Sequence, residues 1–203
     1  MSCRELAEHP DVGDLTPRAQ RSTQATAAAR PEKARRVSHR QRWVVETMAI
    51  APDDQVLEVG CGRGTAVSLV AERLTGGRIV AIDRSATMAR LAAKRNEIHI
   101  SSGRVEIRRA ELESVDFPPG HFTKIFAVNV SLFWLGSATA QMDRLRHLLV
   151  PEGRLYVFGE RPTAANVSAT ERLLAAHGFA TTTSVAPSGQ GRVLSCVTGT
   201  LTR

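Results

Sequence analysis

The chain has 203 residues, of which 42% are hydrophobic and 23% charged, with a formal net charge of +7. This length suits one domain with a sizeable core, and the composition is ordinary for a globular protein. No apolar run approaches the roughly 20 residues of a membrane span, and the N-terminal residues lack the apolar stretch of a secretory signal. The three cysteines stand at unrelated spacings, which argues against a disulfide framework or a cysteine zinc site and favours a cytoplasmic protein.

Most of the positive charge is concentrated in residues 30–42, which carry +5 of the net +7. The basic residues of this run are Arg30, Lys33, Arg35, Arg36, Arg40 and Arg42, against the single acid Glu32. Such a run is typical of a solvated surface, but nucleic acids and anionic lipid surfaces also attract it. No aromatic residues interleave to stack on bases. We therefore favour a small-molecule partner and keep nucleic acid as an alternative.

The chain order of the elements predicts an α/β protein. Residues 1–29 are expected to be a mobile N-terminal segment, and residues 30–203 a single domain that begins with a helical region over 30–51. Strands are predicted at 56–59, 78–82, 104–107, 125–130, 154–158, 180–185 and 192–200, and helices at 65–74, 85–95, 139–149 and 170–177. This alternation predicts a doubly wound, mostly parallel seven-stranded sheet, whose last strand is antiparallel.

A glycine-rich stretch, "VLEVGCGRGTA", follows the first predicted strand. Gly60, Gly62 and Gly64 stand at alternate positions, whereas a tight turn needs only one glycine, so a ligand is expected to approach this backbone closely. A dinucleotide fingerprint would place its third glycine where Thr65 stands. Glu58, just before the loop, would repel a pyrophosphate and attract a cation. The loop therefore predicts a ligand with positive charge.

The second predicted strand ends at Asp83. A carboxylate at the carboxyl end of a strand in such a sheet can accept hydrogen bonds from both hydroxyls of a ribose. Together with the glycine loop, Asp83 predicts an adenosine-like ligand that needs no phosphates.

These residues carry a family resemblance. "VLEVGCGRG" followed by "VAIDRSATMARLAA" resembles motif I and the following acidic motif of the class I S-adenosylmethionine-dependent methyltransferases. The resemblance continues through "RRAELESVDFPPGHFTKIFAVNVSLFW" and "LVPEGRLYVFGE" and covers residues 40 to 200. It implies a Rossmann-like fold, S-adenosyl-L-methionine as cofactor and transfer of a methyl group to a small-molecule acceptor. The alternatives are an RNA or lipid head-group methyltransferase, a dehydrogenase, and a non-catalytic module of the same fold.

The resemblance also implies a set of cofactor-binding residues: Glu58, Gly60, Gly62, Gly64, Asp83, Arg84, Met88, Glu111, Leu112 and Asn129. The glycines and Glu58 would border the methionine part, and Asp83 would hold the ribose. Arg84 and Met88 would lie along the adenine. The pair at 111–112 would meet the adenine amino group, and Asn129 would lie near the transferred methyl.

The sequence departs from the family pattern in three places. Thr123 stands where the family usually has an aspartate, which we interpret as a structural residue. Leu112 is larger than the usual small residue and is expected to crowd the adenine edge. The stretch Asn129-Val130-Ser131-Leu132 lacks the Pro-Pro-aromatic sequence of the amide and exocyclic-amine methyltransferases, so that subclass is disfavoured.

No general base is assigned. A sulfonium methyl is already activated, so positioning and exclusion of water are the main requirements. His39 and Glu160 are the candidates, and each is interpreted as a solvated or capping residue instead. The histidines are scattered, and no metal site is predicted. Trp43, Phe133 and Trp134 would wall an apolar acceptor pocket or serve only as core packing.

Overall fold

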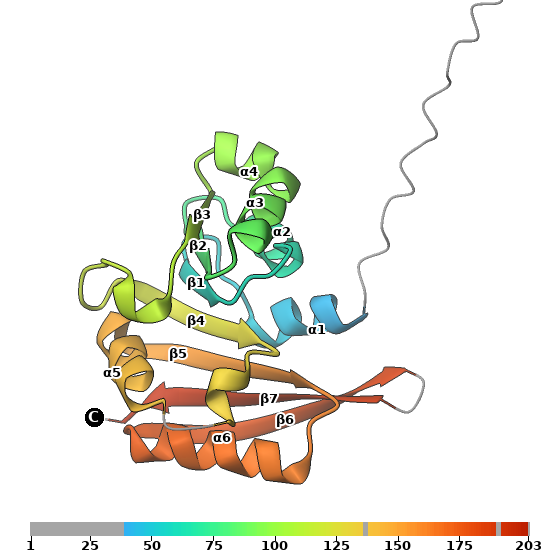
Figure 1. Ribbon diagram of the computed structural model, residues 1–203, viewed down its shortest axis with the longest axis vertical. Coiled ribbons are helices and arrows are strands. Elements are labelled where there is room, and N and C mark those ends of the chain that lie inside the picture. The colour runs from blue at the N-terminus through green and yellow to red at the C-terminus, as the bar shows by residue number, and fades with distance from the viewer. Residues whose placement is uncertain (1–38, 136–137, 190–191, 203) are drawn as a thin grey trace, which may run out of the picture. The chain divides into compact units, whose positions relative to one another are not determined.

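The computed structural model describes residues 39–135, 138–189 and 192–202 (Figure 1). All of them belong to one compact unit, Val37–Arg203. The expected mobile segment 1–29 and most of the basic run lie outside the described residues.

The described residues form a seven-stranded sheet in the order β3-β2-β1-β4-β5-β7-β6. The strands are β1 (Gln55–Val59), β2 (Arg78–Asp83), β3 (Val105–Arg109), β4 (Phe122–Val128), β5 (Leu149–Glu160), β6 (Phe179–Gly189) and β7 (Arg192–Leu201). Neighbouring strands from β3 to β5 are parallel, and β7 runs antiparallel to both β5 and β6. This confirms the predicted fold class, including the antiparallel last strand.

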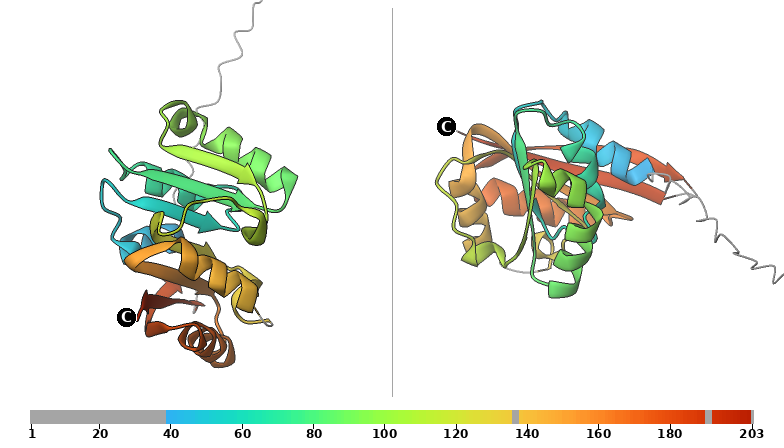
Figure 2. Two further views of the ribbon diagram at one scale, coloured as in Figure 1. Left: turned by 90° about the vertical axis from the view of Figure 1, so that its left-hand side faces the viewer. Right: turned by 90° about the horizontal axis from the view of Figure 1, so that it is seen from above.

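Helices cover both faces of this sheet (Figure 2). They are α1 (His39–Met48), α2 (Thr65–Ala71), α3 (Ala86–Arg95), α4 (Glu97–Ser101), α5 (Thr139–Leu148) and α6 (Ala164–Ala176), with short 3₁₀ turns η1 (Leu112–Ser114) and η2 (Ser131–Phe133). Side chains of α1, α2 and α3 pack in one hydrophobic cluster, and those of α5 and α6 in the other.

The alternation along β1 explains how the sequence builds both clusters. Leu57 and Val59 belong to the α5–α6 cluster, whereas Val56 belongs to the α1–α3 cluster, because successive strand residues point to opposite faces. A fully buried Val or Leu contributes about 1.5–3 kcal/mol, and all three are at least 94% buried. Glu58 shares its face with Val56 and is therefore carried into the interior beneath α1 and α2.

The strand order reverses at β1. The chain runs outward from β1 to β3 and then returns to place β4 on the other side of β1. In an open parallel sheet this reversal leaves a crevice at the carboxyl ends of the two central strands. The glycine loop, which follows β1, therefore lies at the ligand-binding edge of the sheet.

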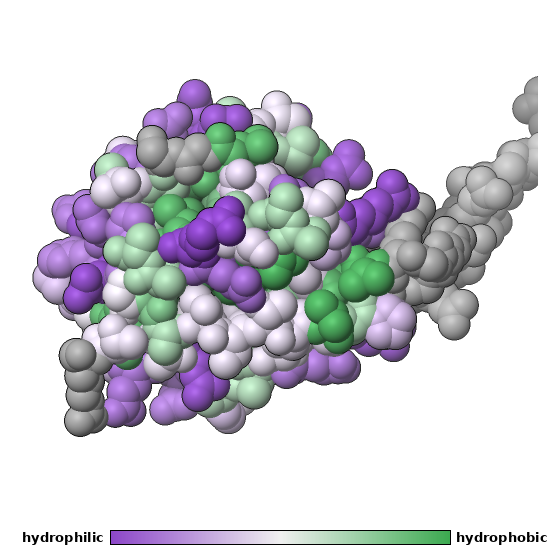
Figure 3. All heavy atoms as spheres, turned by 90° about the horizontal axis from the view of Figure 1, so that it is seen from below, coloured by the Kyte–Doolittle hydropathy of each residue, from purple (hydrophilic) through white to green (hydrophobic). Residues whose placement is uncertain are grey.

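The β6–β7 hairpin extends beyond the rest of the sheet (Figure 1). Pairing with β5 stops at Glu160, opposite Leu194, while β6 and β7 remain paired as far as Gly189 and Arg192. Val193 on this extension is 44% exposed. Polar and apolar side chains are interspersed on the molecular face seen from below (Figure 3).

Several element boundaries differ from the sequence prediction. Helix α6 begins six residues early, after Thr163, whose side chain accepts a hydrogen bond from the Asn166 N–H at 3.1 Å and caps the helix. The predicted turn at 151–153 is an irregularity within β5, where the register moves from Leu149 opposite Phe122 to Arg154 opposite Lys124. The short helix α4 was not predicted.

Candidate active site

The glycine loop bends back over the end of β2. The N–H groups of Gly60 and Cys61 both donate to the Ile82 carbonyl, at 2.9 and 3.0 Å. Gly60, Gly62 and Gly64 have φ of +74°, +54° and +69°, in the left-handed region where a side chain is strained. The sequence signal of three glycines therefore corresponds to three backbone positions that need them.

The three glycines are not equivalent in their surroundings. A Cβ on Gly60 would lie 2.7 Å from Val130 Cγ2, so this glycine allows the loop to pass the chain that follows β4. A Cβ on Gly62 would meet nothing within 4 Å and would project into open space. Gly62 therefore keeps that space clear.

Gly64 has a packing role. A Cβ there would lie 2.9 Å from Cβ of Ala92, in α3, and 2.6 Å from Nδ2 of Asn96, which caps the end of α3. The Gly64 carbonyl accepts hydrogen bonds from Asn96 Nδ2 at 3.0 Å and from the Ser68 hydroxyl at 3.2 Å. Asn96 is completely buried, so this glycine ties α2 to α3.

Asp83 holds the loop in place. Its Oδ2 accepts from the Gly62 N–H and its Oδ1 from the Ser85 N–H, each at 2.9 Å. A carboxylate oxygen has two lone pairs, so each oxygen can accept one more hydrogen bond. Asp83 can thus order the loop and bind two neighbouring hydroxyl groups together.

Glu58 is a buried acid with one carboxyl oxygen that has no hydrogen bond to the described residues. It is 3% exposed, and its Oε2 has no hydrogen bond among the described residues. Burial, and then the negative charge of Asp83, raise the pKa of Glu58 to about 8. A cationic group placed beside Glu58 would satisfy the orphaned oxygen and stabilise the ionised form.

Cys61, in the middle of the loop, is a packing residue. It is 6% exposed, and burial together with the nearby charges of Glu58 and Asp83 raises the pKa of its thiol. The thiol is held in its unreactive protonated form.

Two cavities open at this edge of the sheet and share Gly60 and Asn129. The larger has a volume of about 500 Å³, and its lining includes Gly60, Asp83, Arg84, Glu111, Leu112 and Asn129. The smaller has a volume of about 330 Å³, and its lining includes Arg40, Gln41, Glu58, Gly60, Gly62 and Asn129.

Eight of the ten residues that the resemblance implies line one or both of these cavities. The other two, Gly64 and Met88, line neither. The Met88 N–H donates to the Ser85 hydroxyl at 3.3 Å, which caps α3. Arg40 and Gln41 were not expected at the site; they come from α1, and no motif marks them.

Asn129 lies at the junction of the cavities in a strained conformation. Its φ is +57°, its N–H donates to the Phe158 carbonyl at 2.9 Å, and its Oδ1 accepts from the Glu160 N–H at 2.7 Å. The last bond fixes the side-chain amide, because only the oxygen can accept from an N–H. Non-glycine residues with positive φ gather at functional sites.

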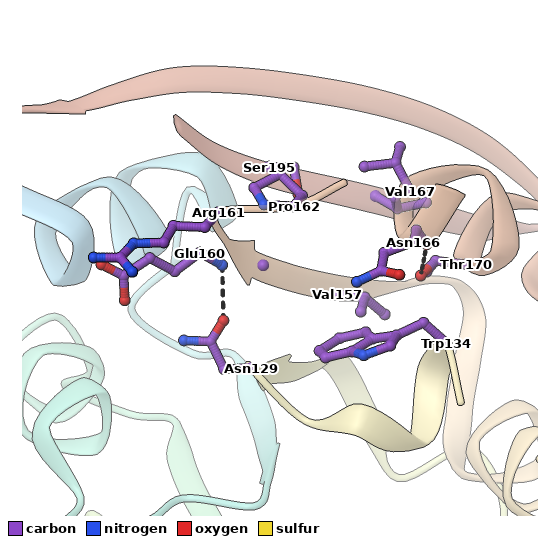
Figure 4. Close-up of a pocket in the computed structure, with 12 residues that line it drawn as sticks. Asn129, Trp134, Val157, Glu160, Arg161, Pro162, Asn166, Val167, Thr170 and Ser195 are labelled. Atoms are coloured by element: carbon purple, nitrogen blue, oxygen red, sulfur yellow. Dashed lines mark hydrogen bonds between the residues drawn. The ribbon is translucent and has the colours of Figure 1, made fainter. Parts of the chain in front are cut away.

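The three aromatic residues considered for an acceptor pocket have different environments. Trp43 packs edge-on against Phe158, with ring centroids 5.6 Å apart, and Phe133 is 1% exposed in the core. Trp134 borders a third and smaller cavity that also reaches Asn129 (Figure 4). The pocket interpretation therefore applies to Trp134 alone.

The two candidate bases also have clear environments. Glu160, at the end of β5, forms an ion pair with Arg40 of α1, and His39 is exposed. This ion pair joins two segments 120 residues apart and accounts for one arginine of the basic run.

Thr123 takes part in a polar cluster at the opposite end of β4. Its hydroxyl donates to Asp54 Oδ1 at 2.7 Å and to the Gln55 carbonyl at 3.1 Å, and Lys124 forms an ion pair with Asp54. Burial raises the pKa of Asp54, but hydrogen bonds from Lys124, Thr123 and the Ala51 N–H outweigh it and hold the pKa below its usual value. The cluster lines neither of the two larger cavities, in keeping with a structural role.

Within the described part of the chain, no three His, Cys, Asp or Glu side chains gather as metal ligands. None of the described helices is long and apolar enough to cross a membrane.

Comparisons with known proteins identify methyltransferases as similar in sequence and fold. Residues 56–153 match the family described as "Methyltransferase domain". The chain is 31% identical over 102 residues to a trans-aconitate 2-methyltransferase from Paracidovorax citrulli, covering 50% of this chain and 37% of the relative. It is 33% identical over 122 residues to nocamycin O-methyltransferase from Saccharothrix syringae, covering 60% and 43%. The chain spans less than half the length of these two curated relatives.

Solved structures show the same fold. A SAM-dependent methyltransferase from Aquifex aeolicus has a TM-score of 0.64 at 17% identity, covering 80% of this chain and 89% of that one. Geranyl diphosphate C-methyltransferase from Streptomyces coelicolor, solved with S-adenosylhomocysteine, has a TM-score of 0.64 at 13% identity and 80% coverage of both chains.

Proposed function

We propose that this chain, which belongs to the class I S-adenosylmethionine-dependent methyltransferases, transfers the methyl group of its cofactor to a small-molecule acceptor. The cofactor of the family supplies an electrophilic methyl group on a sulfonium. The chain's own task is to bind this cofactor in one orientation, to place an acceptor in line with the methyl group and to exclude water.

The methionine end is assigned to the 330 Å³ cavity. Glu58 supplies a buried carboxylate with an orphaned oxygen, which suits the ammonium group. Gly62 leaves open space beside it. Arg40, on the wall formed by α1, gives the same cavity a cation for the carboxylate end. This cavity therefore offers an acid for the ammonium group and a cation for the carboxylate group of an amino acid.

The adenosine end is assigned to the 500 Å³ cavity. Asp83 retains one lone pair on each carboxylate oxygen and faces this cavity, as ribose binding requires. Arg84, Glu111 and Leu112 continue the wall and are assigned to the adenine. Leu112 is 4% exposed, so most of its bulk lies in the core and not against the ligand.

The observation that carries this proposal is that the two cavities are neighbours, with Gly60 and Asn129 in the lining of both. In this arrangement Glu58 of one cavity is available for an ammonium group, and Asp83 of the other is available for a ribose. A dinucleotide would place its pyrophosphate at the glycine loop, beside the Asp83 carboxylate that accepts from the Gly62 N–H, and the negative charge of Asp83 opposes it.

The direct test is titration calorimetry of the purified chain with S-adenosylmethionine, S-adenosylhomocysteine and NAD in parallel. We expect the first two to bind and NAD to give no heat. Asp83→Asn should weaken S-adenosylhomocysteine binding by about 10- to 100-fold, because a charged acceptor of two hydroxyl hydrogen bonds is lost. Binding of NAD alone, or unchanged affinity in Asp83→Asn, would contradict the proposal.

A further inference from the structure

The third cavity has a chemistry of its own. It lies between the last residues of β5, the first half of β7 and the first half of α6, beside Trp134 (Figure 4). Asn129 lines this cavity and both of the cofactor cavities. The third cavity has a volume of about 50 Å³, which is room for roughly four water-sized groups. It therefore suits one end of a small molecule.

Two side chains of this cavity have unused hydrogen-bonding capacity. The backbone of Asn166 is engaged, but its side-chain amide has no partner among the described residues and points into the cavity toward Trp134 (Figure 4). Ser195 is 4% exposed, and its hydroxyl likewise has no hydrogen bond with the described residues. Both groups donate and accept hydrogen bonds.

Space for a ligand group depends on Gly159. A Cβ at that position would lie 3.1 Å from Ser195 Oγ and 3.7 Å from Pro162 Cβ. The absence of a side chain there keeps the cavity open between β5 and β7.

The charged residues of the lining are directed elsewhere. Glu160 forms an ion pair with Arg40, and the side chains of Glu160 and Arg161 extend away from the cavity centre, toward α1 (Figure 4). Asn129 turns its Oδ1 to the Glu160 N–H, so its amide nitrogen also points away. A charged ligand group would thus be desolvated without a counterion, which is costly.

We propose that this cavity binds an uncharged, planar, polar group of the methyl acceptor, of the carboxamide or lactam type. The group stacks on the indole of Trp134 and exchanges hydrogen bonds with the Asn166 amide and the Ser195 hydroxyl. The remainder of the acceptor extends past Asn129 toward the cofactor. This assignment rests on the proposed function, because it treats the neighbouring cavities as the cofactor site.

The test compares three probes of one shape: benzamide, benzoate and benzylamine. The full chain is used with Trp43→Phe, which leaves Trp134 as the only tryptophan, and is saturated with S-adenosylhomocysteine. Quenching of Trp134 fluorescence reports binding. We expect benzamide to bind at least tenfold more tightly than the other two, and Asn166→Leu to weaken benzamide about tenfold.

The control variant is Ser168→Ala, on the same helix but outside the lining of this cavity, and it should leave the benzamide affinity unchanged. Benzoate binding as tightly as benzamide, no quenching by benzamide, or an unchanged affinity in Asn166→Leu would each overturn the proposal.

Calorimetry with S-adenosylhomocysteine on the same samples separates this proposal from the proposed function. We expect its affinity to be equal in Asn166→Leu and in the parent chain. If S-adenosylhomocysteine fails to bind, the proposed function is overturned, and the benzamide titrations, repeated without it, still decide the chemistry of the third cavity.

Discussion

The proposed cofactor side and the proposed acceptor side of the crevice are built from different kinds of residue. On the cofactor side, Glu58 and Asp83 place two acids close together, and three glycines hold a left-handed backbone between them. On the acceptor side, neutral groups such as Asn166 and Ser195 line the third cavity, and the charges are turned outward. The first site is marked by two short sequence motifs, at the ends of β1 and β2, whereas the second is assembled from residues of β5, α6 and β7 and the chain that follows β4.

The largest expected effects come from alanine substitutions at two glycines of the loop, one of which should mainly lower stability and the other mainly weaken ligand binding. Gly64→Ala should lower the free energy of unfolding by about 3 kcal/mol, because it adds left-handed strain and overlaps Asn96 and Ala92. Gly62→Ala should cost only about 1 kcal/mol, since its Cβ meets open space, but should weaken S-adenosylhomocysteine binding about 100-fold. Urea unfolding and calorimetry measure the two quantities.

If both glycine variants lose stability equally and neither loses affinity selectively, the loop is only a tight turn. The cofactor side would then have no more claim to a ligand than any other strand-to-helix connection.

Glu58→Gln tests the buried acid through its pH dependence. The folded pKa of about 8 exceeds the ordinary value of 4.5, so the free chain loses stability as the pH rises from about 4.5 to about 8. The glutamine variant lacks this loss, and its melting temperature should exceed that of the parent chain by a margin that grows across this range. Thermal unfolding at pH 5, 6.5 and 8 measures the margin.

At Glu58, the pH dependence of ligand affinity should have the opposite sign to the pH dependence of stability. A ligand ammonium requires ionised Glu58, so the affinity of the parent chain for S-adenosylhomocysteine should rise with pH toward 8, with release of up to one proton near pH 7. In Glu58→Gln the affinity should be about tenfold lower at pH 8 and should release no proton from this site. Calorimetry in two buffers of different ionisation enthalpy checks this, and equal proton release in both proteins would refute it.

Thr123→Val provides a change that should affect neither half of the crevice. It removes two hydrogen bonds, to Asp54 and to the Gln55 carbonyl, and should destabilise the chain by about 1–2 kcal/mol. S-adenosylhomocysteine affinity should stay within twofold of the parent value. A larger loss of affinity would mean that the position usually held by aspartate in the family contributes to the cofactor site.

The smallest effect on stability is expected from a substitution at the ion pair between Arg40 and Glu160, where the two sides of the crevice meet. Arg40→Gln breaks the ion pair with Glu160, whose side chains are 33% and 22% exposed, and should cost about 0.5 kcal/mol. The same variant removes a cation from the cofactor cavity, so S-adenosylmethionine should bind several-fold more weakly. Unchanged binding would assign Arg40 to the ion pair alone.

The sheet was predictable because its strands are short apolar runs closed by glycine or acid, as Val56–Val59 and Arg78–Asp83 illustrate. Helix α6 was predicted too short because its first turns, with Ala164, Asn166 and Ser168, lack an apolar period, and the cap at Thr163 was the only signal. Helix α4 has five residues, none of them buried, and so leaves no amphipathic pattern.

Part of the candidate site could be predicted from the sequence, and part of it could not. Glu58, the glycines and Asp83 lie in contiguous motifs whose chemistry is recognisable. Nothing in the local sequence marks Asn166 or Ser195, because an asparagine in a helix and a serine in a strand acquire their role only from what the fold places opposite them. Gly64 was assigned to the ligand, yet lines neither cofactor cavity: its neighbour Asn96 is 32 residues away in sequence.

The antiparallel course of β7 has a consequence for how such a protein can diversify. Because β7 begins at the ligand edge, residues of its first half lie at the third cavity: Ser195, only three residues beyond the start of the strand, lines it. The outer part of the hairpin, where Pro187 pairs with Val193 and Gly189 with Arg192, has no pairing with β5. If the third cavity binds the acceptor as proposed, changes in this hairpin would alter acceptor choice while the motifs on β1 and β2 stay untouched.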